Sequence, residues 1–268
     1  MQLFKKRKNM KKFKLFTLIA LCSLGKVTLS KSVKYNQKAT NQLIELIPLM
    51  HIPNKTNIIN KAKKLIQAGA NPNAQDSNTG RTLLTMAVMY NLQNLAQFLL
   101  KKGIDPNIKD TILGGTSLIY AQSPEMLELL LKNKFDPNTL GGAVGGNTIL
   151  MRAIDGLVNP HLEGKPKSIA QNKVNVIFKY KPNLNIQNEK GETALIQAAK
   201  RSQEEMVELL LKHGADPTIK NNEGKTAYDV AGERAYIIEN KGEAFKTYKN
   251  HPEFKNNIRR ILDKYKKK

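Results

Sequence analysis

Apolar residues recur at helical spacing along most of the chain, in pairs of short segments that glycine-, proline- and asparagine-rich turns separate. In residues 191–213 the two apolar faces consist of Leu195, Ala198 and Ala199, followed by Val207, Leu210 and Leu211. A period of three to four residues predicts two amphipathic helices rather than strands. Thr193 is suited to cap the first helix and Gly214 to end the second, because glycine tolerates positive φ.

The second helix of this pair has charges that suit its dipole. Ser202, Glu204 and Glu205 form its opening turn, and Lys212 and His213 lie at its closing end. One helical hairpin of this kind cannot bury its own apolar stripe, so copies of it must stack side by side. The pattern therefore predicts an all-α fold, a solenoid of stacked helix pairs with capping helices at its ends.

Two independent markers repeat along the sequence. Gly-x-Thr opens each unit, at Gly80, Gly114, Gly146, Gly191 and Gly224, with spacings of 34, 32, 45 and 33 residues. A turn similar to Gly-Ala-Asp-Pro-Asn occurs at residues 69–73, 103–107, 134–138, 181–185 and 214–218, with spacings of 34, 31, 47 and 33. Because both markers keep the same period, the chain is built from internal repeats.

These residues resemble the ankyrin-repeat family, whose units open with Gly-x-Thr-Pro-Leu-His-x-Ala-Ala and close with a Gly-Ala-Asp-Pro-Asn-like turn. Residues 191–218 match this pattern except at Ala194 and Ile196, where the family often has Pro and His. The resemblance covers roughly residues 55–232 and extends more weakly to the C-terminus. It implies a curved solenoid whose units are a helix–turn–helix and a projecting hairpin loop. The first helices and loop tips then line a concave surface.

We expect a signal segment at residues 1–30 and a repeat domain at residues 31–268. The expected parts of the domain are a cap at 39–79, repeats at 80–113, 114–145, 146–190 and 191–223, and a C-terminal repeat and cap at 224–268. The unit opening at Gly146 is longer than its neighbour by 45 minus 33, or 12, residues. The excess falls within 156–171, between its two helices, where insertions form loops on one side of a solenoid.

The N-terminus is typical of a secretory signal. Seven basic residues and no acidic residue precede an apolar run at 15–24. The run has ten residues, whereas a membrane-spanning helix needs about 20. Cleavage after Gly25 or after Ser30 satisfies the small-residue requirement, and translation starts at Met1 or at Met10. We therefore expect an exported chain, either periplasmic or secreted.

The chain is strongly basic, with 44 basic and 22 acidic residues and a formal charge of +22. Cleavage after Gly25 removes seven positive charges, and 22 minus 7 leaves about +15. Such a balance attracts acidic proteins, nucleic acids or anionic membranes through a salt-sensitive field. One cysteine cannot form an internal disulfide, and the four histidines lack a paired-ligand spacing. We expect no metal and no cofactor.

The candidate partner-binding residues lie at hairpin tips and at variable positions of the first helices. They are Met86, Met89, Tyr90, Ile112, Leu113, Tyr120, Leu140, Val144, Arg152 and Asp155. Exposed apolar patches tend to mark interaction sites, and Tyr and Met are favoured in binding cores. The competing interpretation is that the apolar tips pack on their neighbours and that the Met residues fill gaps between repeats.

Sequence features give little support for catalysis. His161 and Glu163 lie in a polar loop that supplies no burial to tune an acid–base pair. Residues 141–148 superficially fit a phosphate-binding loop, but Asn147 stands where a lysine is needed and no apolar strand precedes them. We expect a non-enzymatic, monomeric scaffold that binds another protein on the concave face of the repeats beginning at Gly80, Gly114 and Gly146.

The C-terminal segment supports an alternative hypothesis. One face of the expected helix carries Phe254, Ile258, Ile261, Leu262 and Tyr265. The basic patch consists of Lys255, Arg259, Arg260, Lys264, Lys266, Lys267 and Lys268. Such a helix is either the solubilising cap of the stack or a basic adaptor that docks on an anionic membrane or an acidic polymer. Nucleic acid is not expected as a partner, because aromatic residues are not interleaved with the basic ones.

Overall fold

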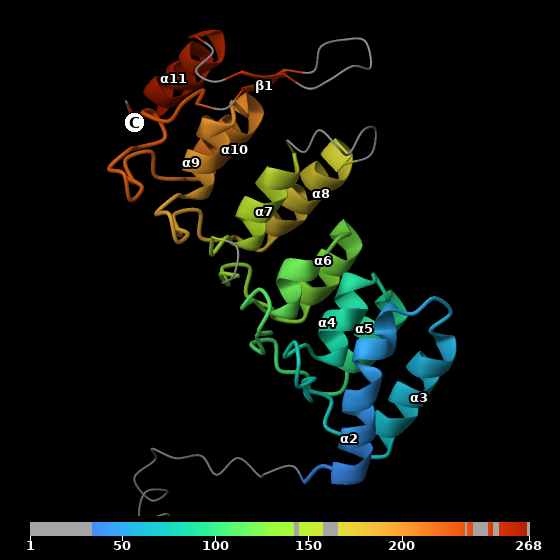
Figure 1. Cartoon of the computed structure of the whole chain (residues 1–268). Coiled ribbons are helices and arrows are strands. Elements are labelled where there is room, and N and C mark those ends of the chain that lie inside the picture. The colour runs from blue at the N-terminus through green and yellow to red at the C-terminus, as the bar shows by residue number, and fades with distance from the viewer. Residues whose placement is uncertain are drawn as a thin grey trace, which may run out of the picture. The chain divides into compact units, whose positions relative to one another are not determined.

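The computed structural model describes residues 34–141, 145–157, 166–233, 235–237, 246–248 and 252–266. The expected signal segment at 1–30 lies outside these ranges, and so do His161 and Glu163 of the expected insertion. Residues 36–268 form one compact unit. Its described part consists mainly of helix pairs that follow one another in chain order (Figure 1).

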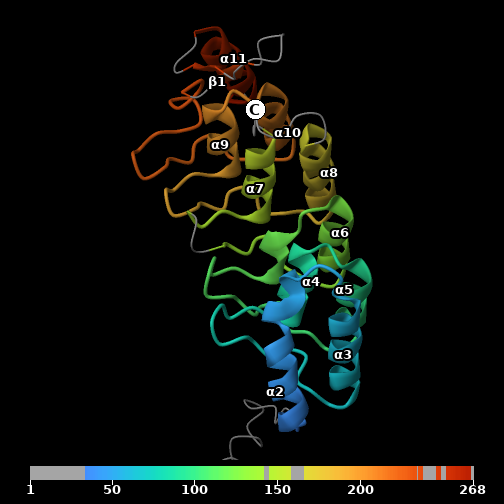
Figure 2. The ribbon, with the colours of Figure 1, turned by 45° about the vertical axis from the view of Figure 1, so that its right-hand side comes forward.

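Each helix pair has a first and a second helical element. The pairs are α2 (Gln37–Leu46) with α3 (Thr56–Gln67), α4 (Leu83–Met89) with α5 (Gln93–Leu100), the 3-10 helix η2 (Ser117–Tyr120) with α6 (Pro124–Lys132), α7 (Ile149–Gly156) with α8 (Pro166–Lys179), and α9 (Ala194–Lys200) with α10 (Glu204–Lys212). A short 3-10 helix, η1 (Pro48–His51), lies between α2 and α3. In Figure 2 the second helices form one layer, the first helices form the next, and the hairpin loops project beyond them.

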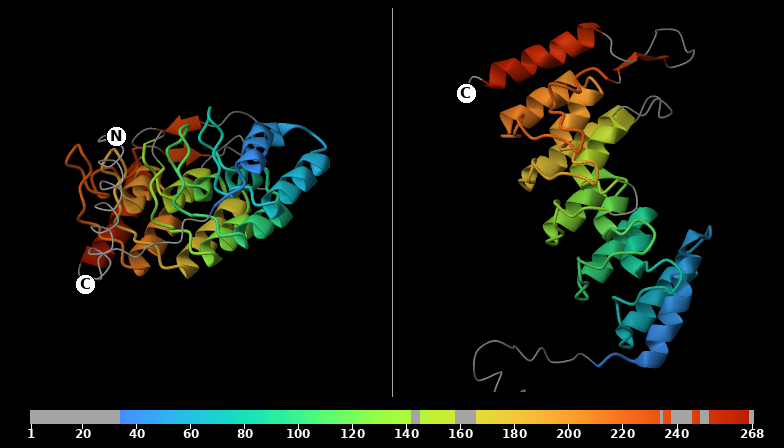
Figure 3. Two further views of the ribbon diagram at one scale, coloured as in Figure 1. Left: turned by 90° about the horizontal axis from the view of Figure 1, so that it is seen from below. Right: turned by 60° about the vertical axis from the view of Figure 1, so that its left-hand side comes forward.

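The pairs stack because each one packs on the next. First helices contact first helices, as α4 contacts η2 and α7 contacts α9, while α6 contacts α8 in the outer layer. Figure 3 shows this succession from two further directions. The all-α repeat solenoid expected from the sequence is confirmed.

Threonine hydroxyls cap three of the first helices. The hydroxyls of Thr82, Thr148 and Thr193 accept hydrogen bonds from the N–H groups of Thr85 (3.1 Å), Met151 (3.3 Å) and Ile196 (3.2 Å), respectively. Each bond satisfies one of the N–H groups that a helix start leaves unpaired. The Gly-x-Thr marker therefore sets where these helices begin.

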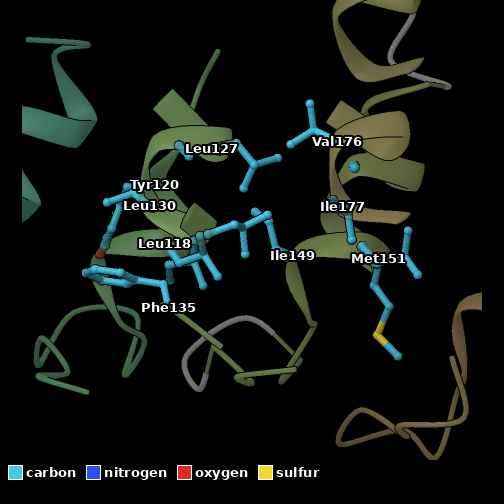
Figure 4. Close-up of a cluster of buried hydrophobic side chains, with 14 of the residues drawn as sticks. Leu118, Tyr120, Leu127, Leu130, Phe135, Ile149, Met151, Val176 and Ile177 are labelled. Atoms are coloured by element: carbon cyan, nitrogen blue, oxygen red, sulfur yellow. The ribbon is translucent and has the colours of Figure 1, made fainter. Parts of the chain in front are cut away.

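The apolar stripes meet in one continuous core. Figure 4 shows its part between the second and third repeats, where Leu118 and Leu127 lie near Ile149 and Ile177. Leu118 and Ile149 are each 1% exposed. Burial of a side chain of this size contributes about 1.5–3 kcal/mol. The stacking of neighbours thus stabilises pairs that would be too small alone.

Asparagines of the proline-containing turns join successive repeats. Asn73 Oδ1 accepts from the Asp105 N–H at 2.9 Å, and Asn185 Oδ1 accepts from the Asp216 N–H at 2.9 Å. In each case the donor lies one repeat further along the chain. These bonds hold neighbouring hairpin loops in register.

The second repeat departs from the expected helix pair. Its first element, η2, is a four-residue 3-10 helix, whereas α4 has seven residues and α7 has eight. The cause is local, because Ser123 and Pro124 already begin α6. Ser123 Oγ accepts from the Met126 N–H at 3.2 Å, and proline is suited to the first helical turn.

Ser202 precedes Glu204 in the sequence, but its side chain does not cap α10. Its φ is +59°, in the left-handed region, and its side chain makes no cap bond to the helix. Asn91 occupies the corresponding junction between α4 and α5 with φ +52°. These residues instead make the tight reversal between first and second helices.

The insertion in the third repeat is shorter than expected. Helix α7 ends at Gly156 and α8 begins at Pro166, so residues 166–171 are helix and not loop. Ala170 is buried and continues the stripe of Val174 and Ile177. This stripe and the N-terminal proline extend the helix toward its start.

The N-terminal cap contains a complete helix pair. Helix α2 packs against α3 although it lacks a Gly-x-Thr opening. Asn36 replaces the threonine, since its Oδ1 accepts from the Ala39 N–H at 3.1 Å. Leu43 and Met50 are fully buried and seal this end of the core.

The C-terminal end differs from a repeat. After Gly224 the described chain forms turns instead of a first helix, and the Asp229 carboxylate accepts from the N–H and hydroxyl of Thr226. Two short antiparallel strands, β1 (Ala235–Ile237) and β2 (Lys246–Tyr248), were not expected. Helix α11 (Pro252–Lys266) then packs against α10.

Candidate protein-interaction face

The first helices and hairpin loops together form the surface that we call the inner face. Three predicted apolar residues are exposed there: Tyr90 by 36%, Ile112 by 45% and Leu140 by 37%. Met89 and Leu113 are partly buried against the core. Met89, Tyr90, Ile112 and Leu113 belong to the repeat at 80–113, and Leu140 belongs to the repeat at 114–145.

Two predicted contact residues are not available to a partner. Met86 is 5% exposed and Tyr120 is 7% exposed, so the prediction that these side chains are exposed is wrong. Met86 is the fourth residue after Thr82 and belongs to α4, and Tyr120 is the fourth residue after Thr116 and belongs to η2; α4 and η2 contact each other. Here the competing interpretation, packing between repeats, holds. Val144 lies outside the described residues.

Three positions recur where one repeat meets the next, and we call each such set an inner-face triplet. Position one is the residue between Gly and Thr of a repeat. Position two lies in the hairpin loop of the next repeat. Its main-chain N–H donates a hydrogen bond to the carbonyl of the residue between Gly and Thr in that next repeat, as the Asn188 N–H does to the Glu192 carbonyl at 3.0 Å. Position three is the fourth residue after the next capping threonine. The triplets are Arg81, Asp110 and Tyr120; Gly115, Gly141 and Arg152; Asn147, Asn188 and Gln197; and Glu192, Asn221 and Val230.

The triplet between the third and fourth repeats is closed by hydrogen bonds. Asn147 Oδ1 accepts from Asn188 Nδ2 at 2.8 Å and from Gln197 Nε2 at 3.0 Å. Asn188 and Gln197 are buried. Three side chains from different elements therefore bind one another, while Gln197 Oε1 stays buried without a hydrogen-bond partner of its own in the described chain.

The triplet between the first and second repeats is open. Arg81 Nε, Asp110 Oδ2 and the Tyr120 hydroxyl are buried and make no hydrogen bond of ordinary geometry, although the Asp110 carboxylate and the Arg81 guanidinium both act on the Tyr120 hydroxyl at close range. The Arg81 guanidinium lies 5.4 Å from the Tyr120 ring centroid. Burial raises the pKa of Tyr120, and the nearby Asp110 carboxylate adds to the rise. Buried polar atoms without partners are costly, and they are uncommon in folded proteins.

The triplet between the second and third repeats has one long side chain. Gly115 and Gly141 are its first two members, and the Ile119 side chain occupies the space where their Cβ atoms would lie. Arg152, the third member, is half-buried and forms no ion pair with an acid of the described chain.

The charges of the later repeats are satisfied by one another. Arg201 pairs with Asp155 at 2.6 Å, and Lys200 pairs with Glu192 at 2.9 Å. Glu233 continues the chain of contacts, 3.8 Å from Lys200 and 3.5 Å from Lys225. Asp155, a predicted contact residue, is thus engaged within the molecule. Burial raises its pKa despite the neighbouring Arg201 and Arg152.

The N-terminal cap and the first repeat carry cations that form no ion pair with the described chain. All ion pairs of the described chain involve residues from Glu128 onward, so Lys55 and Arg81 belong to none. Lys55 Nζ lies 4.2 Å from the Tyr90 ring centroid and donates to the Met50 carbonyl at 3.1 Å. The exposed ring of Tyr90 is therefore already in contact with a cation.

Lys173 adds a second cation near Arg152. Its ammonium donates to the Ala121 carbonyl at 2.8 Å, at the end of the shortened η2. Burial lowers the pKa of Lys173 to about 8, and the charge of Arg152 contributes to the decrease. The sequence gives no local signal for this residue, which reaches across 52 positions to its acceptor.

Helix α11 places the basic patch at the end of the stack. Ile258 and Leu262 are fully buried, so the apolar face that would enter a membrane surface is covered within the protein. Arg259 packs over the Tyr228 ring at 4.5 Å, Lys255 is half-buried, and Arg260 and Lys264 are exposed. The side chain of Lys266 and all of Lys267 and Lys268 lie outside the described part.

The described residues hold no cluster of three or more His, Cys, Asp or Glu side chains arranged to bind a metal ion. Among the helices described here, none combines the length and the apolar character needed to cross a membrane. Thr148, which the phosphate-loop interpretation would use, caps α7 instead.

Comparison with known proteins identifies the family. Models of ankyrin repeats match residues 18–110 and 49–141, described as three copies, and residues 179–231, described as many copies. The chain belongs to the ankyrin-repeat family. Ankyrin-repeat proteins are generally protein-interaction scaffolds and are typically non-enzymatic.

Solved structures share this fold. The ankyrin repeat protein EF0377 has a TM-score of 0.58 and 23% identity, with 87% of this chain and 100% of that chain covered. The ankyrin repeat domain of Bcl-3, a member of the IkappaB family, has a TM-score of 0.59 and 21% identity, with coverage of 92% and 91%. A chain in the complex of the Bdellovibrio bacteriovorus predatory endopeptidase Bd0816 with immunity protein Bd3460 has a TM-score of 0.54 and 28% identity, with coverage of 86% and 99%.

Proposed function

We propose that this protein is an exported, non-enzymatic scaffold that binds one partner protein on the inner face of its first three repeats. The observation that carries the proposal is the exposure of Tyr90 and Ile112 in the first repeat and of Leu140 in the second, at first-helix and hairpin positions. Exposed apolar side chains that form a patch are typical of interaction sites. Since the repeats are held by a continuous core, few residues need to be ordered on binding, which limits its entropic cost.

The similarity to a chain of the Bdellovibrio complex supports a particular kind of partner. That structure joins a predatory endopeptidase to an immunity protein. We propose that the partner of this chain is likewise an enzyme, and that the basic, apolar N-terminal segment exports the chain to meet it. A purified endopeptidase from the same compartment is the first partner to test.

Site-specific photo-cross-linking tests the proposal. A photoreactive residue replaces Tyr90 or Ile112 in the full chain expressed in its native cell, and mass spectrometry identifies the linked protein. The matched control is Ile169 on α8, which is 42% exposed but lies on a second helix. The same protein should be linked from both inner-face positions and not from Ile169.

Substitution then tests the contact with the purified partner. Tyr90→Ser together with Ile112→Ser should abolish binding, whereas Ile169→Ser should leave it unchanged. Tyr120 is unsuited to this purpose, because it is buried and its loss would disturb the stack. Binding that survives the double substitution contradicts the proposed face. Recovery of the chain with an uncleaved N-terminus in the cytoplasm contradicts export.

A further inference from the structure

Charge is distributed unevenly over the outer layer, which the second helices form. Helix α10 holds three acidic residues and α6 holds two. Residues 56–69 and 93–103, which contain α3 and α5, hold five lysines and no acidic residue. Between Glu45 and Asp105 the sequence has one acid, Asp76, which is buried and bonded within its own hairpin. The N-terminal part of the outer layer is therefore positively charged, and no acid on these helices compensates it.

Lysines gather at the C-terminal ends of the first four second helices, and we call this set the basic edge. Its members are all exposed, and they are Lys64, Lys101, Lys102, Lys132, Lys134 and Lys181. None of these ammonium groups forms an ion pair with an acid of the described chain. The turns that follow contain Asp105 and Asp136, whose carboxylates accept from the N–H groups of Asn107 and Asn138 in the same turns, each at 2.9 Å.

Contacts between neighbouring repeats bring the members of the basic edge side by side. The ammonium groups of Lys63 on α3 and Lys102 beyond α5 lie 5.6 Å and 5.7 Å from the centroid of the same Phe98 ring. Beyond α6 and α8, the Asn183 N–H donates to Asn138 Oδ1 at 2.8 Å and joins the two turns. Figure 2 shows α3, α5, α6 and α8 following one another in one layer. The lysines at their ends therefore form a row and are not scattered over the surface.

Two members of the basic edge occupy a backbone conformation that favours glycine. Lys134 has φ +67° and Lys181 has φ +47°, whereas the same turn position in three other units holds Gly69, Gly103 and Gly214. A lysine at positive φ strains the main chain. A cation also interacts favourably with the end of a helix, but this interaction is available in the last helical turn without strain. The fold alone therefore does not account for these two lysines.

We propose that the basic edge binds the surface of an anionic lipid bilayer, which holds the protein at a membrane by its outer layer and leaves the inner face free. This inference goes beyond the proposed function, because it concerns a different face of the solenoid and needs no partner protein. The negative surface potential of such a bilayer attracts exposed lysines. The attraction decays within about 10 Å at moderate salt. Lysines along one edge therefore act together, and distant ones contribute little.

A bilayer fits this edge better than an acidic protein or a nucleic acid. All members of the basic edge are lysines, whose ammonium is a point charge and lacks the planar fork by which arginine binds a carboxylate or phosphate in a fixed geometry. The ring of Phe98 is half-buried and already contacts two cations, so it offers little free face for the stacking of bases. The edge thus supplies summed charge without a specific geometry, which suits a plane of lipid headgroups.

Co-sedimentation with lipid vesicles tests the proposal. The chain beginning at Lys31 omits the expected signal segment and keeps the whole compact unit. It is mixed either with vesicles of phosphatidylglycerol and phosphatidylcholine or with vesicles of phosphatidylcholine alone. The chain should bind the anionic vesicles and not the neutral ones, and added salt should weaken the binding.

Substitutions that remove equal charge then locate the contact. Lys64→Gln with Lys102→Gln should lower the partition coefficient for anionic vesicles on the order of tenfold. The matched control, Lys109→Gln with Lys190→Gln, removes two exposed lysines from hairpin loops and should lower it by less than about threefold.

Replacement by glycine separates binding from folding. Lys134→Gly with Lys181→Gly relieves the strained main chain and should leave the denaturant midpoint at least as high as that of the wild type. The same variant should bind anionic vesicles on the order of tenfold more weakly, because two charges of the basic edge are lost. Full vesicle binding by this variant would contradict the proposal.

Other outcomes would also overturn the inference. Equal losses in the edge variant and the hairpin control show that net charge, and not the edge, is responsible. Loss of vesicle binding only with Arg260→Gln and Lys264→Gln places the membrane contact on α11. Binding of polyglutamate or oligothymidylate without binding of anionic vesicles assigns the positive charge to an acidic polymer. Circular dichroism of each variant confirms that the fold is intact.

The inner-face variant separates this inference from the proposed function. Tyr90→Ser with Ile112→Ser should abolish partner binding and leave vesicle binding unchanged. If that variant loses vesicle binding as well, the membrane contact lies on the inner face and the inference is wrong. If it keeps both the partner and the vesicles, the proposed function is wrong and the membrane contact stands.

Discussion

The ammonium of Lys173, in the third repeat, donates a 2.8 Å hydrogen bond to the carbonyl of Ala121, in the second. Ala121 directly follows the shortened η2. Because the helix does not continue, this carbonyl has no following helical N–H to accept from. A side chain of the outer layer thereby satisfies a main-chain group of the inner layer. The bond joins two repeats at the place where the first-helix layer is thinnest.

Titration of Lys173 should make the free energy of unfolding depend on pH in the alkaline range. Its pKa is about 8 in the folded chain and 10.5 ordinarily. Because the folded pKa is the lower one, the charged form is disfavoured on folding, and stability should rise as pH increases from about 8 to about 10.5. Lys173→Met should raise the free energy of unfolding at neutral pH by on the order of 1–2 kcal/mol. Urea unfolding at several pH values measures both, and a pH-independent difference between variant and wild type would contradict the prediction.

Asp76 should contribute an acid-sensitive part of stability. Burial acts to raise its pKa, but hydrogen bonds from Thr79, Asn78 and Arg81 outweigh burial and lower it. A lowered folded pKa gives stabilisation that is present above the unfolded value of about 3.9 and is lost as pH falls through the folded pKa. Asp76→Ala should cost about 2 kcal/mol at neutral pH, measured by thermal unfolding. Asp76→Asn keeps one acceptor oxygen and should cost less; equal losses would show that the hydrogen bonds are not the cause.

Two glycines at the same repeat position should differ in their tolerance of alanine. Gly191 has φ +70°, and an added Cβ would lie 2.7 Å from the Asn222 backbone nitrogen. Gly224 has φ +74° but nothing within 4 Å of that point. Gly224→Ala should therefore cost about 1 kcal/mol, from backbone strain alone. Gly191→Ala should cost about 3 kcal/mol, because strain and overlap add. Denaturant midpoints of the two variants decide, and similar costs would rule out the steric explanation.

The asparagine links between repeats should be individually measurable. Asn185→Ala removes the acceptor for the Asp216 N–H and should destabilise the chain by about 1 kcal/mol. Asn107 has the same place in an earlier turn, but its side chain makes no hydrogen bond within the described chain. Asn107→Ala is therefore the matched control and should change stability by less than about 0.5 kcal/mol. Calorimetric melting temperatures compare the two.

Features that depend on neighbours in sequence could be predicted well. Thr193 caps α9 and Gly214 takes a positive φ, because caps and helix ends are decided within about one turn of chain. Ser202, which the sequence places in the opening turn of the second helix, instead precedes α10 and makes the reversal between the helices, with φ +59°. Local residues also explain η2, since Ser123 and Pro124 start the next helix early.

Exposure of the candidate contact residues could not be predicted in the same way. Met86 and Tyr120 occupy variable positions of first helices, yet both are buried. Ile112 and Tyr90 remain exposed although they are equally apolar. Whether such a side chain is covered depends on the size and conformation of the residues opposite it, about one repeat away in the sequence.

By itself, the sequence determined the repeat period, the helix pairs, their threonine caps and membership of the ankyrin-repeat family, because these follow from local pattern and from burial of a periodic apolar stripe. Only the tertiary structure decided which triplets close and which stay open. Arg81, Asp110 and Tyr120 are brought together by stacking. Hydrogen bonds and charge interactions act over a few ångströms of space, and residues this far apart in the chain become neighbours only when the repeats are packed.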